Sequence, residues 1–332
     1  IKNHTTQKYK AVCKVRSRVR FALTGTPVEN RLGELWSIFS FLMPGYLPPY
    51  KSFCSRFEKP IVQEEDQTAV RRLNQLTGPF ILRRMKADVL KELPPKTENV
   101  YRIELEEEQR KLYLAAVVDA REKLQAAKPE DKMAVFAVLM RLREICCDPR
   151  LIADNWEGGS AKLDACAELV SSAVEGGHRI LLFSQFTSML ELLAKRLDAE
   201  GISHFTLQGS TPKPVRAELV RRFNGGEVSV FLISLRAGGT GLNLTAADIV
   251  IHYDPWWNVA AQNQATDRAY RIGQQNPVQV YKLIAQDTIE EKIVELQQAK
   301  QSLADTVTGT ADGAILSMRP DELLQLLEGS EP

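Results

Sequence analysis

The feature that most constrains the fold is an alternation in the second half of the chain. From about residue 160 onward, short apolar runs rich in β-branched residues are separated by longer stretches with the periodicity of amphipathic helices. The runs that we predict to be strands cover residues 179–183, 204–208, 228–234, 248–253 and 278–284. Strands that alternate with helices are typical of a parallel sheet covered by helices. The pattern therefore predicts a complete α/β domain over residues 160–300.

The first third of the chain carries a different pattern. A predicted strand over residues 19–23 runs into the sequence TGTP, and an amphipathic helix follows at residues 32–42. This order is typical of the last part of an α/β unit, and the segments that follow it are mostly helical. We therefore predict a partial α/β domain with a helical protrusion over 1–99, a helical linker with a second protrusion over 100–159, the complete domain over 160–300 and a tail over 301–332.

Composition restricts the kinds of partner and site. The 332 residues include 43 basic and 42 acidic side chains, so attraction for a nucleic acid must come from local clusters. The five cysteines are scattered without a C-x-x-C pair, which indicates a reduced, intracellular protein. No apolar run reaches the roughly 20 residues that a membrane helix needs, so we expect no membrane partner. The chain starts in mid-pattern at Ile1, and we expect it to be part of a longer polypeptide.

Two arginines lie three residues apart in the sequence QNQATDRAYRIGQ, residues 262–274. On a continuous helix Gln264, Arg268 and Arg271 would lie at i, i+4 and i+7, and all three would share a face. The planar guanidinium group stays protonated and matches pairs of phosphate oxygens. The alternative is a solvated basic face with salt bridges, for example to Asp267. Both interpretations remain open on these residues alone.

A glycine-rich loop and a pair of tryptophans precede this segment. The sequence SLRAGGTGLNL, residues 234–244, follows a predicted strand directly, so it leaves the carboxyl edge of the sheet, where α/β proteins bind ligands. Its Gly239 and Gly241 would allow backbone amides to approach a phosphate, although a purely structural turn fits equally well. Exposed Trp256 or Trp257 would stack on a nucleic acid, and buried rings would belong to the core.

Several nucleotide and catalytic motifs are absent from the sequence. No G-x-x-x-x-G-K-[ST] loop occurs, and no predicted strand ends in an Asp-Glu pair placed to hold magnesium. The four histidines are isolated from one another, and we predict that His252 is a core or edge residue of its strand. We predict no metal site in this chain.

Seven blocks of the chain together resemble motifs III to VI of the Swi/Snf-type DNA-translocating ATPases of helicase superfamily two. They are LTGTPVENRLGELWSIFSFLMPG (23–45), ILRRMKADVLKELPPK (81–96), LREICCDPRL (142–151), RILLFSQFTSMLELL (179–193), LQGSTPKPVR (207–216), LISLRAGGTGLNLTAADIVIHYDPWWN (232–258) and QATDRAYRIGQ (264–274). The blocks come in the family order and span nearly the whole chain. IKN at the start resembles the residues after the family's Asp-Glu box, so we expect the chain to lack that box and the Walker lysine. Its short connections resemble a bacterial member.

This resemblance implies two RecA-like domains with ATP and Mg²⁺ in a cleft between them. Arg268 and Arg271 would be arginine fingers that reach the γ phosphate, with the magnesium ligands in sequence not present here. The other nucleotide-binding or coupling positions implied by the resemblance are Gln264, Gly239, Gly241, Asp267, Thr24, Gly25 and Thr26. We therefore expect the chain alone to have essentially no ATP turnover.

The same resemblance implies double-stranded DNA as the track. The positions that match DNA-contacting residues of the family are Gln185, Ser210, Thr211, Arg236, Asn243 and Trp257. Contacts of this kind are made to phosphates, so they would be independent of base sequence and sensitive to salt. We expect a monomer that acts on DNA, with a nucleoprotein or polymerase complex as a candidate target, in the cytoplasm at the nucleoid if bacterial or in the nucleus if eukaryotic.

Two further interpretations remain, and three positions depart from the family pattern. The segment could be a non-enzymatic DNA-binding or partner-docking module whose ATPase half has degenerated. A sugar-nucleotide transferase would need an acidic sugar site, which the sequence does not show. Asp148 and Tyr270 stand where the family usually has histidine, and Val259 replaces an expected proline. None of these changes removes a predicted arginine finger.

Overall fold

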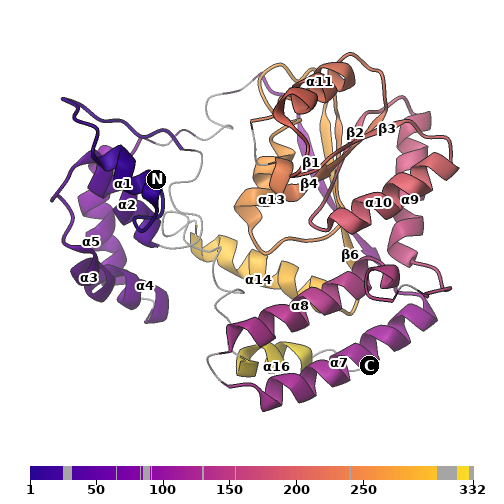
Figure 1. Cartoon of the computed structure of the whole chain (residues 1–332), viewed down its shortest axis with the longest axis horizontal. Helices are drawn as coiled ribbons and strands as arrows, with labels where there is room; N and C mark the ends of the chain where they lie inside the picture. Colours follow the sequence, from indigo (N-terminus) through magenta and orange to yellow (C-terminus); the bar gives the residue numbers. More distant parts are fainter. Residues whose placement is uncertain are drawn as a thin grey trace. The chain divides into compact units, whose positions relative to one another are not determined.

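A computed structural model describes residues 1–24, 32–64, 66–82, 84, 90, 92–128, 131–153, 155–238, 241–304 and 320–328. The chain divides into two compact units, and each is described by itself. The first unit comprises Ile1–Val89 and Gln298–Ile315, and the second comprises Leu90–Gln297 and Leu316–Pro332. Figure 1 labels their helices and strands.

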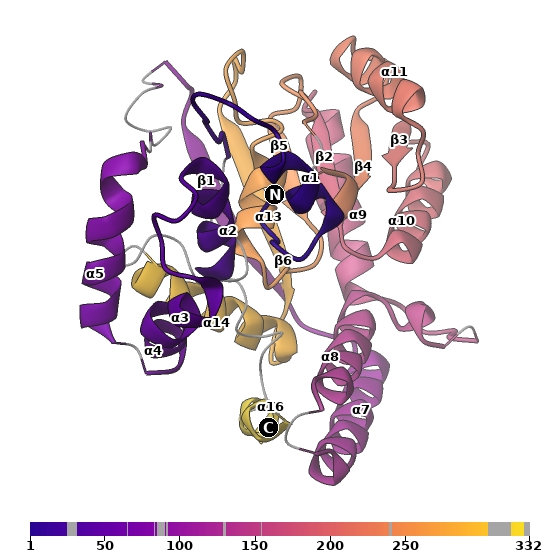
Figure 2. The ribbon, with the colours of Figure 1, turned by 60° about the vertical axis from the view of Figure 1, so that its left-hand side comes forward.

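The second unit is built on a parallel sheet. Its six strands have the order β1-β6-β5-β2-β4-β3, and every neighbouring pair is parallel. The strands are β1 (Lys96–Ile103), β2 (Ile180–Ser184), β3 (His204–Leu207), β4 (Val230–Ser234), β5 (Ile249–His252) and β6 (Val278–Ala285). Strands β2 to β6 lie within two residues of the predicted runs, and Figure 2 shows them side by side. The predicted α/β fold is confirmed.

Helices cover both faces of this sheet, as Figure 1 shows. Helices α9 and α10 pack on one face, and α11 and α13 pack on the other. Successive side chains of a strand point to opposite faces, which is why β2, β4 and β5 are buried along their whole lengths. The helices of this unit are α7 (Glu107–Ala126), α8 (Lys132–Cys147), η3 (Pro149–Leu151), α9 (Ala161–Glu175), α10 (Thr187–Ala199), α11 (Lys213–Asn224), α12 (Leu235–Gly238), α13 (Val259–Thr266), α14 (Ile289–Ala304), which extends past Gln297, and α16 (Pro320–Glu328).

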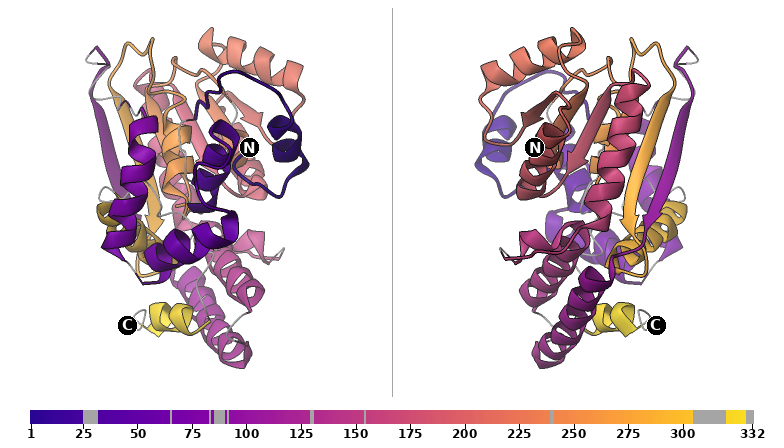
Figure 3. Two further views of the ribbon diagram at one scale, coloured as in Figure 1. Left: turned by 90° about the vertical axis from the view of Figure 1, so that its left-hand side faces the viewer. Right: turned by 90° about the vertical axis from the view of Figure 1, so that its right-hand side faces the viewer.

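Strand β1 is an edge strand that the sequence pattern did not predict. It pairs with β6 from Lys96 opposite Val278 to Ile103 opposite Ala285, and Figure 3 shows the two strands side by side. All its residues except Ile103 are exposed, so its sequence KTENVYRI lacks the apolar run of an inner strand. The sequence analysis placed a domain boundary at residue 99, within β1. The strand belongs wholly to the second unit, because it pairs with β6 of that unit over its whole length.

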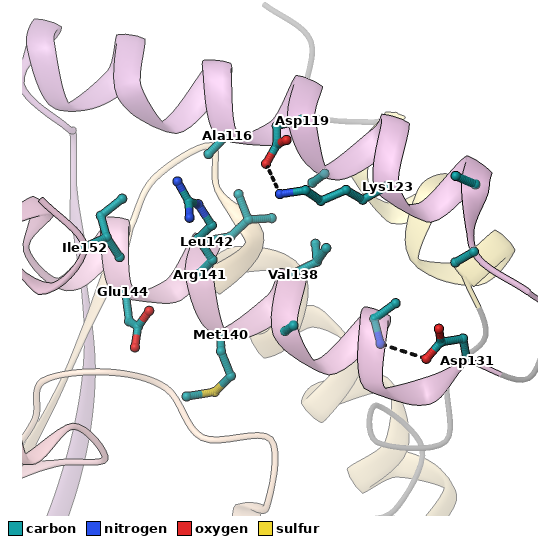
Figure 4. A pocket seen from close by; sticks show the side chains of 15 residues that line it. Ala116, Asp119, Lys123, Asp131, Val138, Met140, Arg141, Leu142, Glu144 and Ile152 are labelled. Atoms are coloured by element: carbon teal, nitrogen blue, oxygen red, sulfur yellow. Dashed lines mark hydrogen bonds and ion pairs between the residues drawn. The ribbon is translucent and has the colours of Figure 1, made fainter.

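A helical pair, α7 and α8, extends from this sheet. The carboxylates of Glu107 and Glu108 lie in the first turn of α7, where they oppose the positive end of the helix dipole. Figure 4 shows a groove of about 690 Å³ between the two helices. Alanines line much of it, and the Asp119–Lys123 ion pair lies at its rim. None of the residues that the sequence predicted as a site lines this groove.

The predicted tail contains a helix that packs back on this pair. Leu323 and Leu327 of α16 are fully buried, and Figure 3 shows the helix beside α7 and α8. The guanidinium of Arg121 on α7 donates to the backbone carbonyl of Leu327 at 2.8 Å. This bond pairs a cation with the carbonyl end of α16, which is the negative end of a helix dipole.

The described part of the first unit is helical. Leu32, Leu35 and Phe39 of α2 pack with Phe53 and Leu73 in one apolar core. The predicted strand at residues 19–23 is wrong: the segment has no strand partner among the described residues, and Phe21 and Leu23 are 80% and 96% exposed. Its elements are α1 (Gln7–Cys13), α2 (Leu32–Leu42), α3 (Tyr50–Phe53), the π-helix η1 (Cys54–Glu58), α4 (Lys59–Gln63), α5 (Gln67–Thr77) and the 3-10 helix η2 (Gly78–Phe80).

Across the described ranges, none of the helices has the length and apolar character required to cross a bilayer.

Candidate functional site

Four segments predicted to contact DNA follow the carboxyl ends of neighbouring strands. Trp257 follows β5, Gln185 follows β2, Arg236 follows β4 and Ser210 follows β3. The strands adjoin one another in that order, β5-β2-β4-β3, and all are parallel. The topology therefore places these segments in a row along one edge of the sheet, which we call the carboxyl-edge row. This is the edge at which α/β proteins bind their ligands.

The loop after β3 is held by an arginine that the sequence analysis did not single out. Arg216 of α11 donates to the backbone carbonyls of Thr211 at 2.8 Å, Gln208 at 3.1 Å and Gly209 at 2.8 Å. The Thr211 hydroxyl accepts the Gln208 N–H at 3.1 Å, whereas Ser210 is exposed. The bonds from Arg216 and Thr211 thus fix the backbone of the loop, and the Ser210 side chain is exposed to solvent.

The segment after β4 turns at once into the short helix α12. Leu235 and Ala237 face the core, and Arg236 between them is exposed. The Ser234 hydroxyl accepts the Ala237 N–H at 3.4 Å and closes the turn. Arg236 is therefore an exposed cation in the middle of the carboxyl-edge row.

The loops after β2 and β5 meet at a buried ion pair. Arg143 of α8 donates to the Asp254 carboxylate at 3.0 Å, and neither side chain is exposed. Asp254 also accepts the Ser184 hydroxyl at 2.6 Å and the Gln185 N–H at 3.1 Å. The same guanidinium donates to Gln185 Oε1 at 2.9 Å and to the Pro255 carbonyl at 2.7 Å. Arg143 is another functional candidate that the motif analysis missed, although it falls on the buried face of its helix with Leu139 and Cys146.

The tryptophan pair lies over this arginine. The rings of Trp256 and Trp257 stack with their centroids 4.1 Å apart, and Phe136 meets Trp257 edge to face at 6.0 Å. Trp257 is only 5% exposed, so its ring belongs to the core in this structure. A stacking contact with DNA would require the side chain to rotate, and the direct DNA contact of Trp257 stays a prediction.

The arginine segment differs from its predicted helix. Helix α13 ends at Thr266, and the residues after it form turns. Gln264 is exposed on the helix, but Arg268 and Arg271 come after its end, so the predicted i, i+4, i+7 face does not exist. Beyond the helix end the Arg268 N–H donates to the Ala265 carbonyl at 3.1 Å, three residues back, and the Arg268 carbonyl accepts the Leu244 N–H at 3.0 Å. Gly273 then turns the chain with a φ of 101°.

The two guanidinium groups of this segment are near neighbours. Arg271 donates to the Leu242 carbonyl at 3.2 Å, which places it against the loop that follows α12. Burial and the adjacent Arg271 charge lower the pKa of Arg268, and the Asp267 carboxylate opposes this shift. Arg268 is 8% exposed and Arg271 is half-buried. The structure therefore brings two mutually repelling cations together beside the 241–245 loop.

The arginine segment is separate from the carboxyl-edge row. The ring of Tyr270, between the two arginines, lies 5.9 Å from the Nζ of Lys96, the first residue of β1. Lys96 and its partner Val278 are the amino ends of β1 and β6. In parallel strands the amino ends lie at the edge opposite the carboxyl ends. The second unit therefore carries two distinct polar regions.

The remaining predicted site residues are distributed unevenly. Asn243 is exposed, and its carbonyl accepts Asn224 Nδ2 at 2.9 Å, at the end of α11 opposite to Thr211. The 12 residues of α11 separate the two ends by about 18 Å, so Asn243 lies with the arginine segment and apart from Ser210. Gly241 and Thr24 are exposed. Gly25, Thr26 and Gly239 lie outside the described residues.

The described histidine and acidic residues give no sign of a metal centre. His252 is buried, and its Nε2 lies 2.9 Å from the Thr266 hydroxyl, as expected for a core histidine. Asp148, at the position where the resembled family has histidine, binds the Arg150 guanidinium at 2.8 and 2.6 Å. No group of three His, Cys, Asp or Glu side chains suited to a metal forms among the described residues.

Comparison with known proteins identifies related sequences and structures. A model of the SNF2-related domain matches residues 1–151, and a model of the helicase conserved C-terminal domain matches residues 161–273. The putative ATP-dependent helicase/translocase YwqA of Bacillus subtilis is 40% identical over 335 residues, which cover 98% of this chain and 36% of that protein. The SWI/SNF-related matrix-associated actin-dependent regulator of chromatin subfamily A member 1 of Mus musculus is 37% identical, over 98% of this chain and 33% of that protein. The chain spans about a third of the length of these relatives.

This chain covers a larger share of two solved structures than of those relatives. The Sulfolobus solfataricus SWI2/SNF2 ATPase core in complex with double-stranded DNA is 35% identical, with a TM-score of 0.60 over 97% of this chain and 69% of that one. The same organism's SWI2/SNF2 ATPase core domain is 36% identical, with a TM-score of 0.61 over 99% of this chain and 68% of that one. With the parallel α/β fold, the ordered motifs and these matches in agreement, the chain belongs to the SWI2/SNF2 family of helicase superfamily two.

Proposed function

We propose that this chain is part of an ATP-driven motor that moves along double-stranded DNA without separating the strands. The observation that carries the proposal is the division of the second unit into two polar regions. Donor side chains follow three adjacent strands at the carboxyl edge, and two neighbouring arginines lie at the other end of the sheet. A solved relative with the same fold is described as an ATPase core in complex with double-stranded DNA.

The arginine segment fits an anion of high charge. Arg268 and Arg271 repel each other in a partly buried setting, and a phosphate group between or beside them would offset that repulsion. In the proposal these residues bind the terminal phosphate of ATP. Magnesium would be held by residues outside this chain, which contains no Asp-Glu box at a predicted strand end. ATP with Mg²⁺ supplies phosphoryl-transfer chemistry, and the guanidinium groups stabilise the negative charge that develops on the transferred phosphate.

The carboxyl-edge row fits a DNA backbone. The Ser210 hydroxyl, the Gln185 amide and the Arg236 guanidinium are hydrogen-bond donors spread over three adjacent strand ends. Donors of this kind bind phosphate oxygens irrespective of the bases, and each neutralised phosphate adds to the salt dependence of binding. The row therefore suits a motor that must move over any sequence.

The test is ATP hydrolysis by the whole protein that carries this chain, with and without duplex DNA. We expect wild-type hydrolysis to be stimulated by the duplex. Arg271→Ala or Arg268→Ala should lower stimulated turnover by about 10³-fold while duplex binding is largely retained. Arg221→Ala is the matched control, because Arg221 is an exposed arginine of the same unit that is paired with Glu218 on its own helix. Near-normal turnover in both finger variants would overturn the assignment.

The same assays distinguish the motor from a binding module. A whole protein that binds duplex DNA but hydrolyses no ATP would support a DNA-binding or partner-docking module with a degenerate ATPase half. The 332-residue chain by itself lacks the Walker lysine loop, and we expect it to show only background hydrolysis. Turnover by the isolated chain that depends on Arg271 would contradict that part of the proposal.

A further inference from the structure

The second unit contains a buried arginine that joins its helical pair to the carboxyl-edge row. Arg143 lies on α8, yet its hydrogen-bond acceptors belong to the loops after β2 and β5. The acceptors are Gln185 Oε1, Asp254 Oδ2 and the Pro255 carbonyl, at 2.9, 3.0 and 2.7 Å. A single rigid guanidinium thus sets the distance between two loops of the row.

Charge neutralisation alone does not require this arrangement. The Asp254 carboxylate balances the buried charge of Arg143. This carboxylate also accepts hydrogen bonds from the Ser184 hydroxyl and the Gln185 N–H. The bonds to Gln185 Oε1 and to the Pro255 carbonyl go beyond that pair. They use the fixed fork of the guanidinium, which a lysine ammonium does not possess.

The contact with Gln185 determines which end of its amide is available. Oε1 accepts from Arg143, and the partner of Nε2 among the described residues is the weak acceptor Met140 Sδ, at 3.5 Å. The amide nitrogen, which carries two hydrogens, therefore keeps donor capacity. A donor at this position suits a phosphate oxygen, whereas the carbonyl end would repel one.

Arg143 also supports the tryptophan pair. Its guanidinium carbon lies 4.9 Å from the ring centroid of Trp257, 5.5 Å from that of Trp256 and 5.3 Å from that of Phe186. Cation–π contacts of a desolvated arginine stabilise such an arrangement. Removal of the guanidinium would take this contact from both indoles, and Trp257 would keep its contact with Phe136 of α8.

We propose that Arg143 is a positioning residue for DNA engagement, which holds the loops after β2 and β5 in their DNA-competent arrangement and keeps the Trp256–Trp257 stack in its packed position. The inference rests on the proposed function for the identity of the ligand. It goes beyond that function because it assigns the setting of the DNA-facing loops to a side chain of the helical pair. Arg143 itself is buried and touches no DNA in this assignment.

The principal variant is Arg143→Lys, which keeps a positive charge beside Asp254 but cannot reach all three acceptors at once. Arg143→Met is the stronger variant and removes every donor. The matched control is Lys162→Met, because Lys162 is also a fully buried cation of this unit, paired with Glu290 at 2.5 Å. If this control does not fold, the double variant Lys162→Met with Glu290→Met replaces it. Circular dichroism establishes that each protein compared is folded.

The functional readout is hydrolysis by the whole protein as a function of duplex concentration. We expect Arg143→Lys to raise the duplex concentration for half-maximal stimulation by about tenfold, an effect of about 1.4 kcal/mol on binding. The turnover at saturating duplex should fall by a smaller factor. The Lys162 control should leave the half-maximal concentration unchanged. Equal shifts in Arg143→Lys and in the control, or no shift in either Arg143 variant, would overturn the proposal.

A structural readout separates this inference from the proposed function. Acrylamide quenching of tryptophan fluorescence should increase in Arg143→Met and stay at the wild-type level in the control. If the wild-type protein shows no stimulation by duplex DNA, the proposed function fails. The quenching comparison then still decides whether Arg143 holds the tryptophans. Unchanged quenching in Arg143→Met would reject that role independently of any DNA measurement.

Discussion

The Nζ of Lys162 lies 2.5 Å from the Oε2 of Glu290, and neither side chain exposes any surface to solvent. The pair joins α9 to the first turn of α14, next to the end of β6. The same Oε2 also accepts the Ala285 N–H at 2.8 Å, and the Lys162 ammonium lies 5.4 Å from the Tyr253 ring centroid. The contact therefore holds the start of α14 against the sheet.

Breaking this pair on one side should be strongly destabilising. Glu290→Gln leaves the buried Lys162 charge without a counter-charge, and we expect a loss of about 3–5 kcal/mol in the free energy of unfolding. The double variant Lys162→Met with Glu290→Met removes both charges and should recover most of that loss. Urea unfolding followed by circular dichroism measures both. A double variant as unstable as Glu290→Gln would show that the charges are not the cause.

Acid should destabilise the protein through His252. Burial, reinforced by the nearby Lys282 charge, lowers the pKa of His252 to about 3. The unfolded chain binds a proton at this residue near pH 6.5, so stability falls as the pH drops below that value. By pH 5 the contribution amounts to about 2 kcal/mol. Between pH 7.5 and pH 5, the unfolding free energy of His252→Gln should therefore change by about 2 kcal/mol less than that of the wild-type protein. An unchanged pH dependence in His252→Gln would contradict this assignment.

Arg236 should contribute to DNA binding without regard to sequence. It is an exposed cation in the middle of the carboxyl-edge row, and the proposal assigns it to a phosphate. Arg236→Ala should weaken binding equally for unrelated duplexes and lower the slope of log affinity against log salt by about 1. Fluorescence anisotropy titrations at several salt concentrations measure both quantities, with Arg221→Ala as the control. An unchanged slope would remove Arg236 from the DNA surface.

Helix α16 should detach from the helical pair when its buried leucines are shortened. Leu323 and Leu327 are fully buried. Replacement of each by alanine should weaken the packing of α16 on α7 and α8 by about 2–5 kcal/mol. Hydrogen exchange of the α16 amides and of the facing part of α7 should then accelerate. Gln325→Ala is the control, because Gln325 is exposed on the same helix. Unchanged exchange in the double leucine variant would contradict the packing of α16.

Much of the second unit could be predicted because its inner strands are buried on both faces. Such strands are continuous apolar runs, and β2, β4 and β5 stand out for that reason. The sequence placed only the 234–244 loop at the carboxyl edge; the strand order, which aligns the four segments in the carboxyl-edge row, came from the structure. The edge strand β1 gave no such signal, because an exposed strand has no need of an apolar run.

The candidate site was predictable as a set of residue types but not as an arrangement. Local periodicity extended the helix of Gln264 through Arg271, whereas the helix ends at Thr266 and the Arg268 carbonyl accepts the Leu244 N–H instead. That bond depends on a loop more than 20 residues earlier in the chain, which no local pattern contains. Trp257 could be exposed or buried on its sequence alone, and packing against Phe136 and Arg143 determines that it is buried.

The sequence by itself determined the parallel α/β fold, the family, and the presence of two arginines and of donor residues that match the family's DNA contacts. Only the tertiary structure decided that the arginines lie beyond their helix and that Arg143 reaches Asp254, 111 residues away, to join two loops. The physical reason is that apolar burial has a local periodicity that can be read from neighbouring residues. The burial of a charge depends instead on a distant partner that compensates its desolvation.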